Sequence, residues 1–583
     1  MYNQTHLRRG LARFAPAILL PLLAACAGGG ALHSAGSIGR PVTVGVVAIN
    51  DFHGSLEAPR QSVAVADGKG GMVQVPAGGA AWLASAIDAI RAKYPNHLTV
   101  GAGDLISASQ LSSSLYLDEP AIGVANRIGL DFNAVGNHEF DRGRIELQRM
   151  QTGGCQQNTP RKPCQVEQFT GARFGFLAAS TMTENGQTLF PATALKTFGT
   201  GKRRVTVGLI GLTLQGTPDL VSPGGIKGLT FLNEAATINR LVPALKAQGA
   251  DAVVVLIHQG GSQDGISDPN DCKGLTGEIR PILDQLDPGV DLVVSGHTHK
   301  AYVCNYGAIN PAHPVLLTSA GVYGELVTDI TLEIDPVQHK VVGKHAVNVV
   351  VQSAPYTGSK GVVANTALVP QFTPRADVAA YVATYVDAAK AFAQRGVGKL
   401  SGAATGRPLG QLIADAQLAA TRSAGAQIAL MNPFGVRAAL VPASDGSVTF
   451  GDIYAVQPFN NTLVTQSFTG AQLKAILEQG FDANGPEQAL LPSAGFAFRY
   501  DRSRAVGDRI TAMTLDGAPI DPAATYRVTT NNFLAQGGDS FTLFTTGQGA
   551  VIGMSDIDAL EAWLKGDQPR AVPSEERSGE AGR

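Results

Sequence analysis

The amino-acid sequence predicts a layered α/β domain followed by a smaller α+β domain. The chain has 583 residues, more than one core usually organises, since domains typically hold about 100 to 200 residues. Between residues 42 and 335, short apolar runs alternate with polar loops and with stretches of helical period. We predict buried strands at residues 42–49, 98–102, 132–135, 205–212, 252–257 and 292–294.

Helical periodicity then accounts for most of the remaining chain. Apolar residues recur at helical spacing in residues 80–94 and 235–249, and Gly249 is a candidate stop for the second helix. Residues 351–396 are predicted to be a proline-containing linker and a connecting helix that begins near residue 376. Residues 397–565 form the second domain, with helices at 409–425 and 469–481 and a strand-like run at 525–534. The polar tail, residues 566–583, has no apolar period and is predicted to be disordered.

Charge and composition exclude one class of function. Charged residues make up 16% of the chain, and the formal net charge is -2. Proteins that bind nucleic-acid polymers through bulk electrostatics carry clustered Lys and Arg, which neutralise phosphates. The sequence contains no such cluster, so we expect no nucleic-acid polymer among its partners.

The first 26 residues are predicted to direct export. A basic start with Arg8, Arg9 and Arg13 precedes the apolar run FAPAILLPLLAA, the layout of a signal peptide. The end of this segment, Leu-Ala-Ala-Cys26, resembles the lipobox of bacterial lipoproteins. Ordinary signal cleavage near the same place is the alternative. No later apolar run is long enough to cross a bilayer, so we expect a periplasmic protein or an outer-membrane-tethered lipoprotein whose membrane contact is a lipid on Cys26.

The other four cysteines favour two disulfides, as is usual in exported proteins. Three connectivities are possible for them. We prefer Cys155 with Cys164, across the loop CQQNTPRKPC, and Cys272 with Cys304. Because none has the CxxC spacing of a zinc knuckle, a structural role is expected.

Five loops that follow strand-like runs carry side chains able to bind metal ions. They hold Asp51 and His53 in NDFHG, Asp104 in GAGD, Asn137 and His138 in GNHEFD, His258 in LIHQG, and His297 and His299 in GHTH. Five of the 11 histidines fall in these motifs. Side chains two apart in an extended segment share a face, and sites in open α/β sheets form at the carboxyl ends of strands. We therefore expect the loops to converge.

The number of ligands predicts two metal ions. Without His138, the motifs offer seven Asp, His and Asn ligands, too many for one tetrahedral zinc and suited to two ions that share a carboxylate. Asp104, alone in its loop, is the best candidate for the bridge. Such a pair, about 3.5 to 4 Å apart, deprotonates water and clamps phosphoryl oxygens. These ligand types suit Zn, Mn, Fe or Co.

The motifs DFHG, GD, GNHEFD, H and GHTH, in this order, resemble the calcineurin-like metallophosphoesterase domain, and specifically the 5'-nucleotidase and UDP-sugar hydrolase family. The resemblance implies a four-layer β-sandwich flanked by helices over residues 42–350, followed by a smaller α+β substrate-binding domain. It implies that one ion is held by Asp51, His53 and His299, that the other is held by Asn137, His258 and His297, and that Asp104 bridges them. It also implies that His138 and Asp141 are a catalytic pair.

The second domain adds to this resemblance. QPFNNTLV and NNFLAQGGDSF resemble the family's nucleotide pocket, in which two aromatic rings sandwich the base. The rings here would be Phe459 and Phe533, with Asn461 and Asp539 as hydrogen-bond partners. Stacking contributes about 1 to 3 kcal/mol per base with little base specificity. The alternative is that both rings are core residues.

The chain departs from the family pattern at two places. The family often has GGIR where this chain has Asn432-Pro-Phe-Gly-Val-Arg437. Arg437 keeps its place and could bind phosphate or carboxylate, and Asn432 is expected in the same pocket. Two arginines that some relatives carry before the helix at 409 lack a clear counterpart, with Lys399 and Arg407 the nearest substitutes.

The sequence thus predicts metal-dependent hydrolysis of nucleoside 5'-monophosphates, by attack of a hydroxide activated by two metals. A 2',3'-cyclic nucleotide phosphodiesterase and a UDP-sugar hydrolase are alternatives with the same metals. A surface nucleotide-binding lipoprotein with an inactive metal site is the alternative outside enzymes. Because the base pocket and the metal site are expected on opposite sides of the helix near 376–395, we expect a hinge motion between them.

Overall fold

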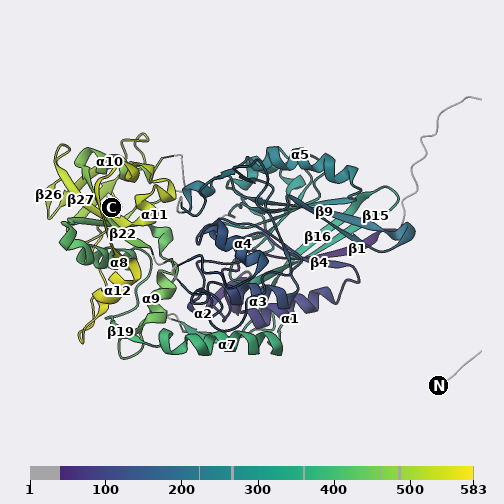
Figure 1. The fold of residues 1–583 in the computed structure, drawn as a ribbon, viewed down its shortest axis with the longest axis horizontal. Coiled ribbons are helices and arrows are strands. Elements are labelled where there is room, and N and C mark those ends of the chain that lie inside the picture. Colours follow the sequence, from purple (N-terminus) through teal and green to yellow (C-terminus); the bar gives the residue numbers. More distant parts are fainter. Residues whose placement is uncertain are drawn as a thin grey trace, which may run out of the picture.

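The computed structural model describes residues 40–581, except residues 160, 222–223, 264–267, 359–360, 460 and 483–486. The predicted signal peptide and Cys26 lie outside the described residues. Figure 1 shows a larger domain, coloured purple to teal, and a smaller one, coloured green to yellow, with α7 (Ala376–Ala393) running along both. Over the described part of the chain, no helix has the length and apolar character that a membrane crossing needs.

Two six-stranded sheets form the larger domain. The first has the order β16 (Lys340–Val350), β15 (Leu326–Asp335), β1 (Val42–Ile49), β4 (His97–Gly101), β5 (Phe132–Ala134) and β6 (Gly175–Leu177). The second has the order β13 (Ala301–Asn305), β14 (Leu316–Ala320), β12 (Leu292–Ser295), β11 (Ala252–His258), β9 (Val205–Thr213) and β8 (Thr193–Phe198).

Both sheets have a parallel centre and antiparallel edges. In the first sheet β1, β4, β5 and β6 run parallel to one another. β15 pairs antiparallel with β1, and β16 pairs antiparallel with β15. In the second, β9, β11, β12 and β14 run parallel, while β8 and β13 are antiparallel. Since parallel strands end at the same sheet edge, their loops gather at one end of the domain.

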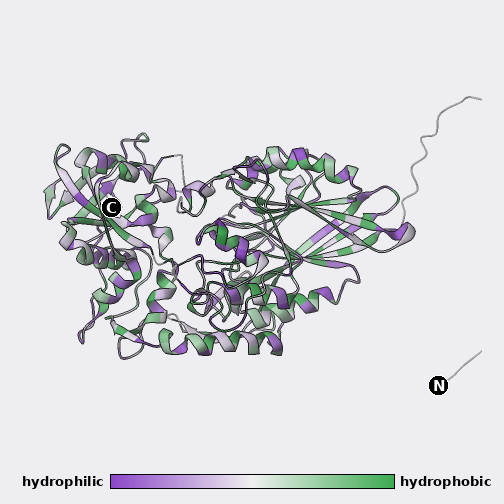
Figure 2. Cartoon of the chain, viewed as in Figure 1, coloured by the Kyte–Doolittle hydropathy of each residue, from purple (hydrophilic) through white to green (hydrophobic). Residues whose placement is uncertain are grey.

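The sheets pack face to face and helices cover their outer faces. Apolar side chains of alternate positions, such as Val44 and Val46 in β1 and Val254 in β11, fill the space between the sheets. The other face of β1 packs on α1 (Ala80–Arg91) and α3 (Glu119–Ile128), and the outer face of the second sheet packs on α5 (Glu234–Ala247) and α6 (Ile279–Leu283). The strands of this domain are mostly green, that is hydrophobic, in Figure 2. The predicted four-layer sandwich is confirmed.

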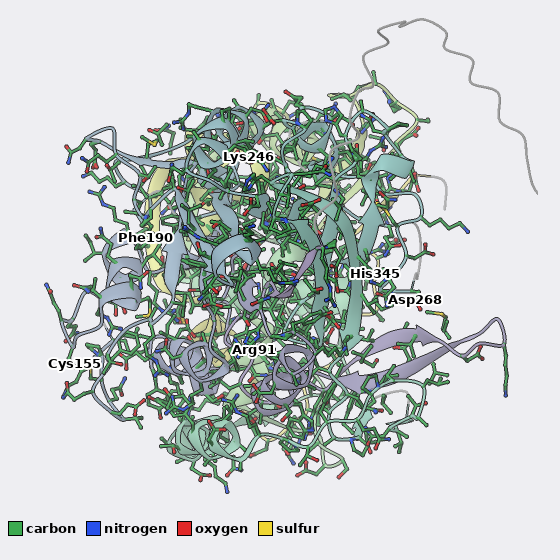
Figure 3. The ribbon with its side chains drawn as sticks, turned by 90° about the vertical axis from the view of Figure 1, so that its right-hand side faces the viewer. Arg91, Cys155, Phe190, Lys246, Asp268 and His345 are labelled. Atoms are coloured by element: carbon green, nitrogen blue, oxygen red, sulfur yellow. A yellow bond between two sulfur atoms is a disulfide. The ribbon has the colours of Figure 1, made fainter. Side chains whose placement is uncertain are left out.

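Shorter elements complete the larger domain and the linker. They are α2 (Leu111–Ser114), α4 (Arg144–Thr152), the hairpin of β2 (Gln61–Ala66) and β3 (Met72–Ala77), the pair β7 (Thr181–Thr183) and β10 (Leu229–Phe231), and the linker hairpin β17 (Tyr356–Gly358) and β18 (Gly361–Val363). The hairpin of β2 and β3 projects from the body of the molecule in Figure 3.

The smaller domain is α+β, as predicted. A five-stranded sheet has the order β23 (Leu491–Pro492), β20 (Ile428–Met431), β27 (Thr525–Asn531), β22 (Thr462–Thr469) and β28 (Gln548–Ser555). A four-stranded sheet has the order β26 (Ala518–Pro519), β25 (Ile510–Leu515), β24 (Phe496–Tyr500) and β29 (Ser578–Glu580), and β19 (Gly396–Lys399) pairs with β21 (Ser447–Thr449). The helices are α8 (Gly406–Thr421), α9 (Phe450–Val456), α10 (Gly470–Gln479), α11 (Asn532–Ala535) and α12 (Asp556–Leu564).

The prediction of a disordered tail is wrong for the described residues up to 581. β29 pairs in parallel with β24, with Phe498 opposite Ser578. The preceding residue, Arg577, is buried and donates from Nη1 to Asp415 Oδ1 at 2.7 Å. A polar segment without apolar period is therefore fixed by backbone pairing with a sheet edge and by one buried ion pair, neither of which periodicity reports.

Both predicted disulfides are present. Cys155 is bonded to Cys164, and Cys272 is bonded to Cys304. Figure 3 shows Cys155 at the edge of the molecule. The first bridge closes a surface loop, and the second ties the segment after β11 to β13, which supports a structural role for all four cysteines.

Candidate metal and phosphoester site

The predicted ligands lie in loops at the carboxyl ends of parallel strands. Asp51 and His53 follow β1, Asp104 follows β4, Asn137 follows β5, and the remaining three histidines end β11 or follow β12. Backbone hydrogen bonds tie neighbouring loops together, since Asp51 N donates to Gly103 O at 3.1 Å and His53 N donates to Asp104 O at 2.9 Å. The sheet geometry therefore converts distant sequence motifs into one cluster.

The first group of ligands consists of Asp51, His53 and His299. Their candidate ligand atoms all lie within 4.8 Å of one another. His53 Nε2 is 3.2 Å from His299 Nε2, and His299 Nε2 is 3.5 Å from Asp51 Oδ1. Asp51 and His53 are almost fully buried.

The second group consists of Asp104, His258 and His297, with Asn137 beside them. The first three also place their ligand atoms within 4.8 Å of one another. Asn137 Oδ1 is 3.1 Å from His258 Nε2 and 3.1 Å from His297 Nδ1. This amide oxygen thus lies between the two histidines, where a shared cation would use it.

Asp104 lies between the groups. Its Oδ2 is 3.0 Å from His258 Nε2 and 3.7 Å from His53 Nε2, so one oxygen faces both. Its Oδ1 accepts a hydrogen bond from His138 N at 2.9 Å. This is the position that the sequence assigned to a bridging carboxylate.

Burial keeps His53 and His297 in the neutral form that binds metal, whereas at His258 the carboxylates of Asp104 and Asp51 outweigh burial and raise the pKa to about 10. His53 Nδ1 donates to Ser107 O and His258 Nδ1 donates to Ala102 O, each at 2.8 Å, which leaves Nε2 of both rings directed into the cluster. Burial lowers the pKa of His53 and of His297 to about 3. Neutral imidazole nitrogens beside two buried carboxylates are a donor set for borderline divalent cations.

The ligand loops have a strained backbone. Five of the predicted ligands have positive φ, a conformation uncommon for residues other than glycine. The angles are 48° for Asp51, 47° for His53, 49° for Asp104, 71° for His297 and 57° for His299. Strain of this kind persists where surrounding structure enforces it and clusters at functional sites.

Glu139 also stabilises the site, although it is not among the residues that the sequence predicts there. Its buried carboxylate accepts from Asp104 N at 2.9 Å, Leu105 N at 2.7 Å and Gly136 N at 2.6 Å. It therefore joins the loop after β4 to the loop after β5. Its signal was its place inside GNHEFD, between two residues already assigned.

His138 and Asp141 are paired beside the ligands. His138 Nδ1 donates to Asp141 Oδ2 at 2.8 Å. Burial alone lowers the pKa of His138, but the carboxylates of Asp141 and Asp104 outweigh it and raise that pKa above its ordinary value. The ring is thus held with Nε2 free to donate.

The smaller domain reaches this pair. The Phe459 ring stacks on the His138 ring, with centroids 5.8 Å apart and planes 15° apart, and Arg437 Cζ lies 5.7 Å from the Phe459 centroid. Tyr454 Oη donates to Ser114 Oγ across the same boundary. The separation that motivated a hinge is therefore absent from this conformation.

The other predicted pocket residues divide into two sets. Asn432 Nδ2 donates to Asp539 Oδ2 at 2.7 Å, and burial raises the pKa of Asp539 to about 6. The Phe533 ring lies so close to Gly538 that a Cβ there would be 2.5 Å from it. Asn461, in contrast, hydrogen-bonds to Asp556 through its side chain and its carbonyl, so its partner is the start of α12.

The substitute arginine is found near Arg437. Arg407, Arg437, Thr405 and Gln61 line a cavity of 410 Å³ between the domains. Lys399 is not among the residues that line it. Among the described residues, no atom accepts a hydrogen bond from the buried Nη2 of Arg437, which leaves this donor for a ligand.

Comparison with known proteins agrees with this architecture. Residues 45–301 match the calcineurin-like phosphoesterase family, and residues 385–546 match the 5'-nucleotidase C-terminal domain. The chain belongs to the 5'-nucleotidase family of metallophosphoesterases. It is thus a member of a family of phosphoesterase hydrolases, with divalent metals as family cofactors.

Individual similar proteins match over most of the chain. A 5'-nucleotidase precursor from Thermus thermophilus has a TM-score of 0.72 and 26% identity, over 93% of this chain and 100% of that one. Endonuclease YhcR of Bacillus subtilis is 30% identical over 92% of this chain, which spans 41% of that relative's length. NAD 5'-nucleotidase of Haemophilus influenzae is 24% identical over 87% of this chain and 86% of the relative.

Proposed function

We propose that the protein is a metal-dependent phosphohydrolase that releases phosphate from nucleoside 5'-monophosphates. The observation that carries the proposal is the convergence of the two ligand groups on Asp104, directly beside the His138–Asp141 pair. A metal cluster alone would suit many functions. A positioned acid next to it suits transfer of a phosphoryl group to water.

The ligand set fits two divalent cations. The groups at Asp51, His53 and His299, and at Asp104, Asn137, His258 and His297, would hold one each, with Asp104 facing both. Bound divalent ions supply an activated water nucleophile and charge neutralisation of phosphoryl oxygens. The donor types suit Zn, Mn, Fe or Co.

His138 would act on the phosphate or on the leaving oxygen. Asp141 holds its Nδ1, which fixes the ring orientation and favours the imidazolium. A protonated Nε2 can then stabilise negative charge and donate a proton to the departing nucleoside oxygen. The stacked Phe459 ring covers the imidazole and limits access of bulk water.

Residues of the smaller domain would bind the nucleoside. Phe459 and Phe533 would stack on the base, and the hydrogen-bonded pair of Asn432 and Asp539 would meet base or ribose. The unpaired Nη2 of Arg437 is a donor for the phosphate. Since stacking tolerates any base, broad base specificity follows.

A second candidate function is hydrolysis of nucleotides that carry a further group, such as a UDP-sugar. A cavity of 850 Å³ between the domains is lined by Asp141 and Phe459, with Arg142, Arg161 and Tyr454 nearby. Phe533, Asn432 and Asp539 are not among its lining residues. The cavity would therefore hold a group beyond the nucleoside, next to the base at the Phe459 ring.

The rival outside enzymes, a nucleotide-binding lipoprotein with an inactive metal site, has no use for a His138–Asp141 pair. Export is supported by the two disulfides and by the description of a similar protein as a precursor. Tethering through Cys26 is part of the proposal. Labelling with a radioactive fatty acid, lost in a Cys26→Ser variant, tests it.

A substrate panel tests the proposed function. Hydrolysis of AMP, UDP-glucose and 2',3'-cyclic AMP, followed by chromatography of the nucleoside and nucleotide products, is measured with wild-type protein and with Asp104→Asn, whose control is Asp387→Asn on the exposed face of α7. We expect AMP to be hydrolysed, Asp104→Asn to be inactive and the control to be unchanged. Hydrolysis of the cyclic substrate with none of AMP, or full activity in Asp104→Asn, would overturn the proposal.

A further inference from the structure

A sixth loop reaches the candidate metal site from the end of β14. Tyr323, in this loop, contacts all three members of the first ligand group. Its N donates to Asp51 O at 2.8 Å. Its ring centroid lies 5.9 Å from that of His53, with 62° between the planes, and 6.2 Å from that of His299, with 55° between the planes.

The backbone of Tyr323 has an unfavourable conformation. Its φ is 57°, between Gly321 at 74° and Gly324 at 66°. Glycine would adopt this turn with less strain, so the turn itself does not require a tyrosine. The side chain must have another role, and its only ring contacts within the described chain are the two histidines.

The loop is fixed to the first ligand motif, so the ring is held in register. Asn50 Nδ2 donates to Gly321 O at 2.7 Å and to Asp51 Oδ2 at 2.7 Å. Asn50 Oδ1 accepts from Ala320 N at 2.7 Å. One buried amide therefore connects the loop after β14 to the loop after β1.

His299 is the ligand that most needs such support. His53 is tied through Nδ1 to Ser107 O, and His258 is tied through Nδ1 to Ala102 O. In the described part of the chain, no hydrogen bond holds His299 Nδ1, and the side chain is 28% exposed. Among the described residues, its ring has two aromatic neighbours, the His53 ring with centroids 5.1 Å apart and the Tyr323 ring, and Tyr323 is the one that is not itself a candidate ligand.

We propose that Tyr323 is a positioning residue that holds His53 and His299 for the first of two metal ions. The inference rests on the proposed metal site and adds a residue to it. Removing a group that orients a ligand typically lowers metal affinity by about 10- to 100-fold. We expect the loss to be confined to the first ion, because the ring contacts of Tyr323 go to His53 and His299 and its backbone hydrogen bond goes to Asp51.

Two substitutions separate the contribution of the Tyr323 ring from that of its hydroxyl, and a third is the control. Tyr323→Phe keeps the ring and removes the hydroxyl. Tyr323→Gly removes the ring and keeps the N–H in a turn that glycine adopts readily. Tyr356→Gly, in the linker hairpin, is the matched control for loss of a tyrosine ring.

Metal content and affinity are the readouts. Each protein is stripped with chelator, refilled with Zn²⁺ against a competing chelator, and assayed for bound ions per chain, with a thermal melt to confirm folding. We expect two ions in wild type, Tyr323→Phe and Tyr356→Gly. In Tyr323→Gly we expect one ion at unchanged affinity and the other weakened about 10-fold or more.

Each outcome is decisive. Two ions of wild-type affinity in Tyr323→Gly would overturn the inference and leave the proposed function intact. Weakening in Tyr323→Phe equal to that in Tyr323→Gly would overturn it too, since the hydroxyl and not the ring would be responsible. Fewer than two ions in wild type would overturn the two-ion site and this inference with it.

Discussion

Removal of the Glu139 carboxylate tests how the loops of the metal site are held together. Its two oxygens accept three buried backbone N–H groups, from Asp104, Leu105 and Gly136. Glu139→Gln can keep two of them, because the amide oxygen can replace Oε2, which accepts from Asp104 and Gly136. The amide NH₂ then faces the Leu105 N–H, donor against donor. Glu139→Ala leaves all three donors without a partner.

The expected magnitudes follow from these counts. A buried N–H without a partner costs about 1 to 3 kcal/mol. Glu139→Gln should therefore lose about 1 to 3 kcal/mol of unfolding free energy, and Glu139→Ala about 3 to 9 kcal/mol. The larger loss is comparable with the whole stability of a domain, which is about 5 to 15 kcal/mol.

Calorimetric melting of the larger domain, together with metal content, is the assay. Glu333→Gln is the control, since this carboxylate on β15 accepts from the Thr43 side chain on β1, outside the ligand loops. We expect melting temperatures in the order control, Glu139→Gln, Glu139→Ala, with metal lost in the same order. Equal melting of Glu139→Ala and the control would refute the reasoning.

Three further predictions follow from the structure. Phe459→Ala should raise KM for AMP by about 5- to 150-fold, from 1 to 3 kcal/mol of stacking, and leave KM for ribose 5-phosphate, which has no aromatic ring, unchanged. An equal rise for both substrates would contradict the stacking role, and Phe392→Ala is the control. Arg577→Ala should destabilise the smaller domain by about 3 kcal/mol in urea unfolding, against about 0.5 kcal/mol for the exposed Arg502→Ala. Equal effects of the two substitutions would contradict a stabilising role for the C-terminal segment around Arg577. Burial raises the pKa of Glu325 to about 8 from an ordinary 4.5, so between these two pH values the folded protein retains a proton that the unfolded chain releases. The unfolding free energy should therefore fall as pH rises from about 4.5 to 8, by at most about 5 kcal/mol at 1.36 kcal/mol per pKa unit. Glu325→Gln should lose this dependence, and an unchanged pH profile would contradict the assignment.

The clustering of the candidate ligands could be predicted from sequence because each ends or follows a strand with a clear apolar run. Asp51, Asp104 and His258 are placed by local pattern alone, and the parallel sheet does the rest. Tyr323 and Glu139 could not be found this way. Their roles depend on which loop lies beside which, and neither is a predicted metal ligand.

Long-range pairing also explains contacts that the sequence did not predict. The tail around Arg577 reads as polar and aperiodic, yet a sheet edge and Asp415 lie where it can reach them. Asn461 was predicted to bind the nucleoside because of its place in the motif QPFNNTLV, but in this structure its side chain hydrogen-bonds to Asp556 at the start of α12. In both cases the deciding partner is distant in sequence.

The account's central claim is that two metal ions, held on either side of Asp104, carry phosphate release from a nucleotide. Metal titration into chelator-stripped protein, with AMP hydrolysis and bound metal measured together, tests it most directly. We predict negligible activity in stripped protein and full activity only when two ions per chain are bound. Full activity without metal, or at one ion per chain, would contradict the account.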